Sequence, residues 1–457
     1  MDKIFSLLNY FGTSVVNSLV NLFIIYVVSQ ELGNEIFNSY IILIFICEFI
    51  STLIIFGLDD GIIRFYRDKG QVEVVKSNIL IFCYFTTFIL FIIWYFIDLN
   101  HFSFISFDIS NDLKNLIFLY GSSLAFVRII SINYISLFKS STFRNLNILR
   151  SLLILLFLIL FFNNNSSLTN VFSFLVISNF VVILLSYKLL IIDFSKFDIS
   201  KILNFLSFSS PLIVYALFSL TSDYSTRILL KYVDFDPSNL ASFNFYLSIA
   251  LLVQGLNRVF NKFWNPYSQN LLSQNKNYNS VCANLSILFS VLFWSIVFFI
   301  SLFDNTTILE YFIKIEFVNN FYYLLLLIPP IYFNFLLMIY ISKYYYLKQT
   351  IKITSLNLIC NIFSILIGVF LSLNYGTLGA IVAFNFSPIF SILLLCIFFY
   401  SDKIHKNLIK SFSFNMLLLS SNFVIVYYFQ SSYVFLIFII VMFYFFINRK
   451  SIKSLAL

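Results

Sequence analysis

The 457-residue chain is poor in charge: charged residues make up 11% of it, whereas hydrophobic residues make up 60%. A typical soluble domain is about a quarter charged, because it needs polar surface to cover its core. The mean hydropathy is +0.94. These values exclude a soluble enzyme, a disordered chain and a secreted disulfide scaffold. The sequence instead predicts an all-α protein that crosses a membrane many times.

The residues that commonly build catalytic and cofactor sites are also scarce. The ten glycines include no GxxxxGK[ST] phosphate loop and no GxSxG, and the two histidines form no HExxH motif. The five cysteines lie in apolar runs without a CxxC pair. A membrane polymerase or glycosyltransferase would need clustered acids or a long loop, and neither is present. We therefore expect no enzymatic activity, no cofactor and no metal site.

Long apolar runs dominate the rest of the sequence. A helix needs about 20 apolar residues to cross the hydrocarbon core of a bilayer. Fourteen runs approach that length, and they are too long and too uniform for barrel strands. They span residues 10–28, 36–56, 77–97, 116–138, 148–162, 171–190, 209–230, 239–256, 281–303, 321–340, 353–373, 378–400, 412–429 and 433–447. We read the first run as a retained helix.

The net charge of +8 reflects orientation in the membrane rather than nucleic-acid binding. Lysine and arginine concentrate on the cytoplasmic side of membrane proteins. If the N-terminus is placed inside and the fourteen helices alternate, nearly all of the basic loop residues lie inside. The loop lysines assigned outside are Lys114, Lys231 and Lys314. This pattern predicts that both termini are cytoplasmic.

A short internal repeat indicates two similar halves. The sequence Phe37-Asn38-Ser39-Tyr40 begins the second predicted helix, and Phe243-Asn244-Phe245-Tyr246 begins the eighth. The offset of an even number of helices gives both copies the same orientation, as in transporters built from parallel repeats. We expect a six-helix lobe over residues 1–200, a second over 201–405, and two further helices and a cytoplasmic tail over 406–457.

Two ionisable residues in the first half lie inside predicted helices, where a charge costs about 2.5–3.5 kcal/mol on insertion scales. Arg128 has no carboxylate within reach on its own helix, so its partner is another helix, a water-filled cavity or an anionic ligand. Its fork of donors suits a pyrophosphate. Glu48, which shares an approximate face with Thr52 and Asp59, is either its structural partner or a proton carrier.

Two further charges lie in the seventh predicted helix. Asp223 and Arg227 are four residues apart, so they share a face and can pair. They either line a polar pathway or neutralise each other so that the helix inserts. Under the 206-residue offset, Asn17 and Asn21 of the first helix occupy the matching positions. Both halves would then carry polar side chains at equivalent places.

Several short passages of the sequence resemble the polysaccharide flippases, the O-antigen and capsule repeat-unit transporters. That family shares a superfamily with multidrug and toxic compound extrusion proteins and lipid II flippases. The passages are Gly57 with Arg64 and Tyr66 closing the second helix, Ser222-Asp223-Tyr224 with Leu229-Leu230 and Asn244-Phe245-Tyr246, Phe263-Trp264-Asn265-Pro266, and Asn374-Tyr375-Gly376-Thr377-Leu378-Gly379-Ala380. Each is short, but together they span nearly the whole chain.

This resemblance implies a flippase of the bacterial cytoplasmic (inner) membrane. Its substrate would be an undecaprenyl-pyrophosphate-linked oligosaccharide, moved to the outer leaflet by alternating access for surface polysaccharide synthesis. Arg128 and Arg227 would hold the anionic group, with Asp223, Glu48, Arg64, Asn17 and Asn21 as further cavity residues. Glu48 or Asp223 would carry a coupling cation, H⁺ or Na⁺. We expect a monomer that contacts membrane lipids and works beside polysaccharide-assembly proteins.

A drug or metabolite antiporter of the same fold is the alternative. The drug exporters of this superfamily usually have twelve helices, so the count of fourteen favours the flippase.

Overall fold

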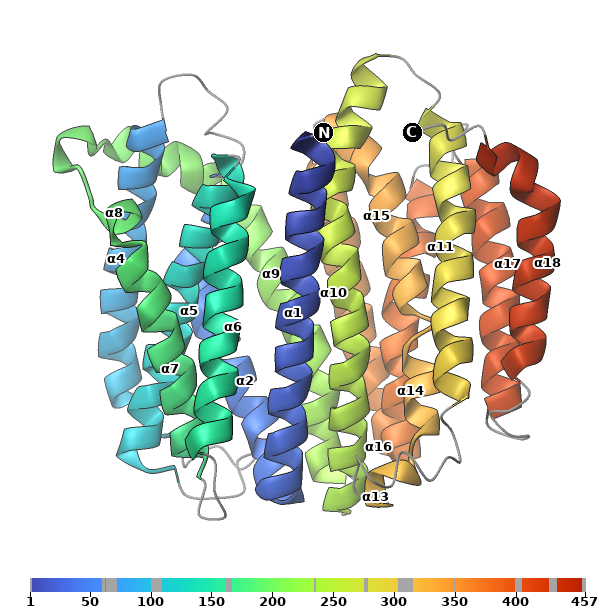
Figure 1. The fold of residues 1–457 in the computed structure, drawn as a ribbon, viewed down its shortest axis with the longest axis horizontal. Coiled ribbons are helices and arrows are strands. Elements are labelled where there is room, and N and C mark those ends of the chain that lie inside the picture. The colour runs from blue at the N-terminus through green and yellow to red at the C-terminus, as the bar shows by residue number, and fades with distance from the viewer. Residues whose placement is uncertain are drawn as a thin grey trace. The chain divides into compact units, whose positions relative to one another are not determined.

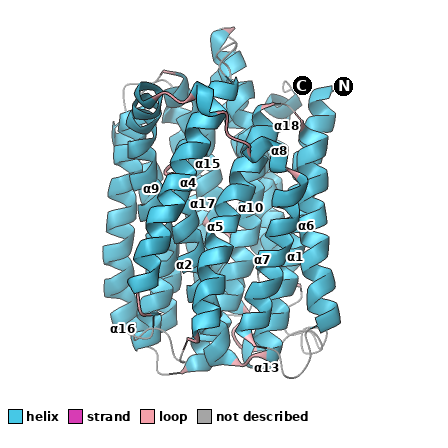
Figure 2. Cartoon of the chain, turned by 90° about the vertical axis from the view of Figure 1, so that its left-hand side faces the viewer, coloured by secondary structure: helices cyan, strands magenta, loops and turns pink. Residues whose placement is uncertain are grey.

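The computed structural model describes residues 2–59, 62, 72–99, 109–137, 139–161, 167–233, 236–274, 278–302, 315–347, 350–398, 405–426 and 434–453. Within these ranges the chain is helical, as Figure 2 shows. Its internal contacts divide it into two compact units, Met1–Tyr224 and Ser225–Leu457. The boundary lies within one helix, α9 (Ile199–Val233).

The first unit is a bundle of long helices (Figure 1). Its principal packed pairs are α2 with α5, α5 with α7, α1 with α6, and α6 with α7. Tyr40 and Tyr120 both place their rings against Phe172. Besides the start of α9, the elements are α1 (Asp2–Glu31), α2 (Asn34–Ile55), α4 (Val72–Phe96), α5 (Asn111–Ser136), α6 (Ser140–Phe161), α7 (Leu168–Leu185), α8 (Tyr187–Leu190) and the 3-10 turn η2 (Phe194–Lys196).

The second unit is built around α10 and α15, which pack together, while α18 packs on α11. Phe289 of α11 stacks on Phe335 of α15, with 3.5 Å between ring centroids. The elements are α10 (Pro237–Ser273), α11 (Tyr278–Ser301), α13 (Ile315–Val318), α14 (Tyr322–Leu327), α15 (Ile331–Tyr346), α16 (Thr350–Phe398), α17 (His405–Val424) and α18 (Val434–Lys453).

Over the described residues, each predicted membrane-spanning run falls mainly on helix, and the tenth is divided between α14 and α15. When the two halves of α16 are counted separately, the described residues form fourteen helices of seven or more residues. Eight described helices are long and apolar enough to cross a membrane on their own, and a bent helix adds a ninth. One of the eight, α16, contains two predicted runs. The prediction of an all-α polytopic membrane protein is confirmed.

Several helix boundaries were predicted wrongly. α1 begins at Asp2 rather than at residue 10, α9 at Ile199 rather than at residue 209, and α17 at His405 rather than at residue 412. The tenth predicted run is divided between α14 and α15. The fifth helix begins at Ser140 rather than at residue 148, because Arg144 finds a hydrogen-bond acceptor on α1. The eighth runs to Ser273 rather than to residue 256, because Trp264 fixes its polar extension to α15. The sixth is interrupted at Ser186, which separates α7 from α8.

Gly376 and Gly379 make α16 a tight helical hairpin. Gly376 has a backbone φ of +57°, a conformation that residues other than glycine rarely adopt. A Cβ built on Gly379 would lie 2.0 Å from the carbonyl oxygen of Leu371, so the two halves of the helix approach backbone to backbone. The glycine passage of the sequence thus has a physical role, which is to reverse the chain in the smallest possible space.

The two copies of the short repeat are both buried. Phe37 and Tyr40 are 0% and 5% exposed in α2, and Phe243 and Tyr246 are each 0% exposed in α10. Each copy lies near the start of a long helix. The repeat therefore marks a core position in each unit rather than a binding surface.

Candidate functional site

An ion pair joins α5 to the turn that follows α2 in the first unit. Nη2 of Arg128 donates to Oδ2 of Asp59. The Asp59 side chain is 12% exposed and that of Arg128 is 48% exposed. The sequence left three kinds of partner open for Arg128, and the structure shows a carboxylate on the turn that follows α2. That carboxylate belongs to Asp59.

The backbone that follows α2 turns so that the Asp59 side chain reaches Arg128. Phe56 has a left-handed conformation, with φ +53°, and its N–H donates to the carbonyl of Thr52. Gly57 follows with a φ of +70°. These two residues turn the chain, and Leu58, which is 1% exposed, anchors the turn in the core. A charge on this turn is therefore held inside the unit.

The depth of the pair follows from helix geometry. Arg128 is eight residues from the end of α5 at Ser136, which corresponds to about 12 Å along the axis. In the predicted orientation that end is cytoplasmic. The guanidinium therefore lies within the cytoplasmic half of the bundle. Its contact with Asp59 uses one nitrogen, so the exposed side of the fork can also meet an anion.

Glu48 lies in a second polar group of the first unit. It is half-buried in α2 and close to Tyr40, Tyr120 and Cys47. Arg150 of α6 lies against the Tyr120 hydroxyl. Glu48 is seven residues from the end of α2, about 10 Å along its axis. This acidic side chain and Arg128 thus share the same half of the unit.

A stripe of polar side chains runs along α1 where it faces α6. Oδ1 of Asn9 accepts a hydrogen bond from Arg144 at 2.7 Å, and its Nδ2 donates to Ser140 at 3.2 Å. Two turns further on, Oδ1 of Asn17 accepts from the Ser151 hydroxyl at 2.6 Å. Asn21, one turn beyond, is exposed. Of the two predicted asparagines, Asn17 is hydrogen-bonded to α6 and Asn21 is exposed.

Sequence reasoning missed Arg144 and Arg150 as members of these polar groups. Both were counted among the cytoplasmic charges. Arg144 precedes the predicted fifth run, and Arg150 lies at its start. The signal available was the spacing of Ser140, Arg144, Asn147 and Ser151, which recurs every three or four residues as on one helical face.

The remaining candidate residues lie elsewhere. Arg227 is 2% exposed in the second unit, on the part of α9 that follows the unit boundary. Asp223 belongs to α9, but its side chain is outside the described residues, as is Arg64. The predicted pairing of Asp223 with Arg227 stays a prediction.

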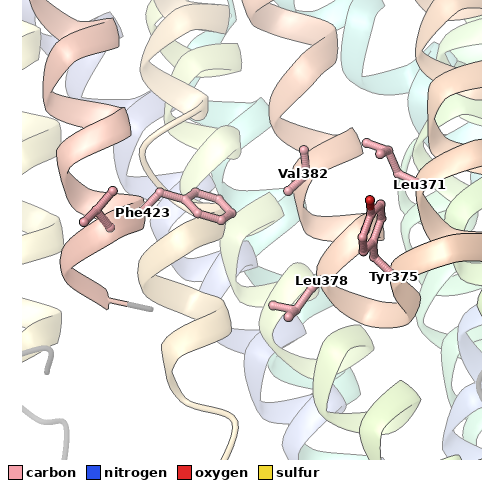
Figure 3. A pocket seen from close by; sticks show the side chains of 7 residues that line it. Leu371, Tyr375, Leu378, Val382 and Phe423 are labelled. Carbon is pink, nitrogen blue, oxygen red and sulfur yellow. The ribbon is translucent and has the colours of Figure 1, made fainter. Parts of the chain in front are cut away.

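The second unit contains an apolar pocket of about 400 Å³ between the α16 hairpin and the end of α17. Figure 3 shows the Tyr375 and Leu378 side chains at the turn of the hairpin, with Phe423 across from them on α17. The remaining lining residues are Leu371, Gly379, Val382 and Val424. Such a lining suits hydrocarbon rather than sugar.

No group of three or more metal-ligating side chains occurs among the described residues. Carboxylates, histidines and thiols in that part of the chain are therefore not arranged as a metal centre.

No protein-family model and no curated protein sequence matches the chain. Solved structures do match it. The inward closed lipid II flippase MurJ superposes with a TM-score of 0.70 at 16% identity, over 96% of this chain and 99% of MurJ. The eukaryotic MATE transporter AtDTX14 gives 0.65 at 13% identity, over 90% and 99%. An inward-facing multidrug resistance MATE transporter of the MOP superfamily gives 0.59 at 14%, over 90% and 95%. The chain has the fold of these proteins.

Proposed function

We propose that this protein is a flippase that moves undecaprenyl-pyrophosphate-linked oligosaccharide repeat units from the cytoplasmic to the outer leaflet. The half-exposed guanidinium of Arg128, held in the cytoplasmic half of the bundle by Asp59, carries the proposal. A planar cation at that depth can take a pyrophosphate from the inner leaflet, because its remaining donors match paired phosphate oxygens.

The division of polar and apolar surfaces supports a lipid-linked substrate. Polar side chains of α1, α2, α5 and α6 gather within the first unit. The apolar pocket beside the α16 hairpin could accept hydrocarbon. A headgroup of sugar and pyrophosphate needs polar partners such as those in the first unit. A prenyl chain is more stable in apolar surroundings than in water. The resemblance of short motifs to polysaccharide flippases points to the same substrate class.

The proposal keeps five further cavity residues, which are Arg227, Asp223, Arg64, Asn17 and Asn21. Glu48 is our candidate for the residue that carries the coupling cation. It is a half-buried acid near tyrosine side chains, and it lies in the same half of the unit as Arg128. Glu48→Gln, which keeps the shape but cannot ionise, should abolish coupled transport while insertion stays normal. Normal transport by Glu48→Gln would remove it from this role.

The proposal is tested in a strain that lacks the protein. Its lipid extract should contain an accumulated prenyl-pyrophosphate oligosaccharide, while surface polysaccharide disappears. Wild-type protein and Lys352→Ala, an exposed control cation of the second unit, should restore both. Arg128→Ala should not, at equal protein level, and Arg128→Lys should restore them in part, because lysine keeps the charge but not the fork.

A cation-coupled drug or metabolite antiporter is the second candidate, and the structural match to MATE transporters favours it. Against it, the MurJ superposition takes in 96% of the chain and the AtDTX14 superposition 90%. Unchanged lipid and glycan pools in the deletion strain, together with new sensitivity to cationic dyes, would establish the antiporter and reject the flippase.

A further inference from the structure

The segment between α7 and the spanning part of α9, residues 187–207, is here called the connector. It comprises α8, η2 and the first turns of α9. Figure 1 shows the start of α9 passing sideways over the upper end of α4 before the helix turns downward. The bend measures 47° between Ile199–Ser207 and Ser209–Lys231. Pro211 explains it, because a proline cannot donate to the carbonyl four residues earlier, that of Ser207.

Two fully buried side chains of α4 hold the connector in place. Oδ1 of Asn78 accepts from the Asp198 N–H at 2.8 Å, and its Nδ2 donates to the Lys196 carbonyl at 3.0 Å. The Ser77 hydroxyl accepts from the Asp193 N–H at 3.2 Å. Ser77 and Asn78 are each 0% exposed. The connector is thus a docked element of the first unit.

The connector also stabilises its own backbone. Asp193 accepts from the N–H and the hydroxyl of Ser195, and Asp198 does the same with Ser200. These bonds satisfy donors at the starts of η2 and α9. Both carboxylates are therefore used locally, so the outward surface of the connector is defined by its other side chains.

That outward surface is unusually apolar for a segment that joins two membrane spans. Phe194 is 75% exposed, Ile199 63% and Leu203 60%, and Ile191, Tyr187 and Phe197 are also exposed. On α9, Ile199 and Leu203 are four residues apart and form one stripe. The exposed Ser200 and Asn204 form the adjacent polar stripe. The start of α9 is therefore amphipathic.

We propose that the connector is inserted in the cytoplasmic leaflet, parallel to the membrane plane, at the boundary between headgroups and acyl chains. Helices with such a face sit about 5–10 Å into that boundary. The connector has a net charge of +1, because it contains three lysines and two aspartates. These are Lys188, Lys196, Lys201, Asp193 and Asp198. Insertion is therefore driven by apolar burial, and it does not require anionic lipid.

The helix that follows the connector packs against the candidate site. A Cβ built on Gly57 would lie 3.0 Å from the Ser209 carbonyl oxygen and 3.2 Å from the Ile213 nitrogen. The start of the spanning part of α9 is thus packed against the turn that carries Asp59.

The depth of the connector can be measured on the full chain in lipid nanodiscs. Cys396 is half-buried and is first replaced by alanine, whereas the other four cysteines are buried. Nitroxide labels are placed at Phe194→Cys and Leu203→Cys, with Asn204→Cys as the matched neighbour. Accessibility to oxygen and to a water-soluble nickel chelate then reports depth, in phosphatidylcholine alone and with phosphatidylglycerol added.

We expect the ratio of oxygen to nickel accessibility to be severalfold higher at residues 194 and 203 than at residue 204, in both lipid mixtures. Equal nickel accessibility at residues 203 and 204 would overturn the proposal and make the connector a water-exposed loop. Low accessibility to both reagents at residue 203 would also overturn it, in favour of a protein-covered surface. Entry of residue 203 only with phosphatidylglycerol would replace insertion with electrostatic adhesion.

Discussion

Arg128 and Asp59 form an ion pair whose two partners differ in burial: the Arg128 side chain is 48% exposed and the Asp59 side chain only 12%. The pair links the C-terminal half of α5 to a turn that the chain makes just after α2. The acid is mostly buried, while about half of the base is not covered by protein. This asymmetry determines what each substitution should do.

Removing the base should cost more stability than removing the acid. Arg128→Ala leaves a mostly buried carboxylate without this partner, whereas Asp59→Ala leaves a guanidinium that is already half-exposed. We expect Arg128→Ala to lower the free energy of unfolding by about 1–3 kcal/mol and Asp59→Ala by about 1 kcal/mol or less, after solvent screening is considered. Thermal unfolding in detergent measures both. A larger loss for Asp59→Ala would contradict the asymmetry.

The α16 hairpin should not tolerate a methyl group at Gly379. A Cβ there meets the Leu371 carbonyl oxygen at 2.0 Å, so the two halves must separate. We expect Gly379→Ala to destabilise the protein by about 1–3 kcal/mol or more, as overpacking does. Gly12→Ala is the control, because a Cβ at Gly12 meets nothing within 4 Å. Alanine there should be neutral or stabilising, by up to about 1 kcal/mol. Equal melting temperatures for the two variants would show that the hairpin is not tight.

Asn78 should control the attachment of the connector. Asn78→Ala removes the acceptor of the Asp198 N–H and the donor to the Lys196 carbonyl, in a place with no exposed surface. An unmet buried polar group costs about 1–3 kcal/mol. Hydrogen exchange of the amides at residues 193–203 should therefore accelerate by about 5- to 100-fold, since each 1.4 kcal/mol corresponds to a factor of ten. Protection of α6 should stay unchanged, and general loss of protection would indicate misfolding instead.

Acid should loosen the start of α9. The hydrogen bond from the Ser200 hydroxyl, with those from backbone N–H groups, lowers the pKa of Asp198 below its ordinary value. A depressed pKa stabilises the folded state above the unfolded pKa of about 3.9, and this contribution is lost as the pH falls below that value. A nitroxide at Asn204→Cys should thus keep constant mobility from neutral pH to about pH 5 and become more mobile below about pH 4.

Asp198→Asn provides the control for this acid transition. Asparagine keeps an oxygen acceptor at the same place but does not titrate. The mobility of the label should then be independent of pH across the acid range. An unchanged acid transition in Asp198→Asn would assign it to other carboxyl groups, of which Asp193 is the nearest candidate, because its pKa is lowered in the same way by Ser195.

The sequence alone was sufficient to predict the membrane class, the number of spans and where most of them lie. These properties are local: an apolar run of sufficient length must become a helix in lipid, because its backbone groups have no other partner there. The glycine passage around Gly376 and Gly379 was also visible, although the sequence did not show why both positions need glycine. Only the 2.0 Å approach to Leu371 explains the second.

The tertiary structure decided how the charges are used. Arg128 could have met Glu48, water or a ligand, and the turn at Phe56 and Gly57 brought Asp59 to it instead. Pairing of this kind depends on a backbone reversal and on the register between two helices, neither of which hydropathy encodes. Likewise, residues 191–198 read as an ordinary loop until the buried Asn78 showed them docked on α4. Hydrophobic runs specify which segments enter the membrane, while specific polar contacts between distant segments decide what the folded bundle can bind.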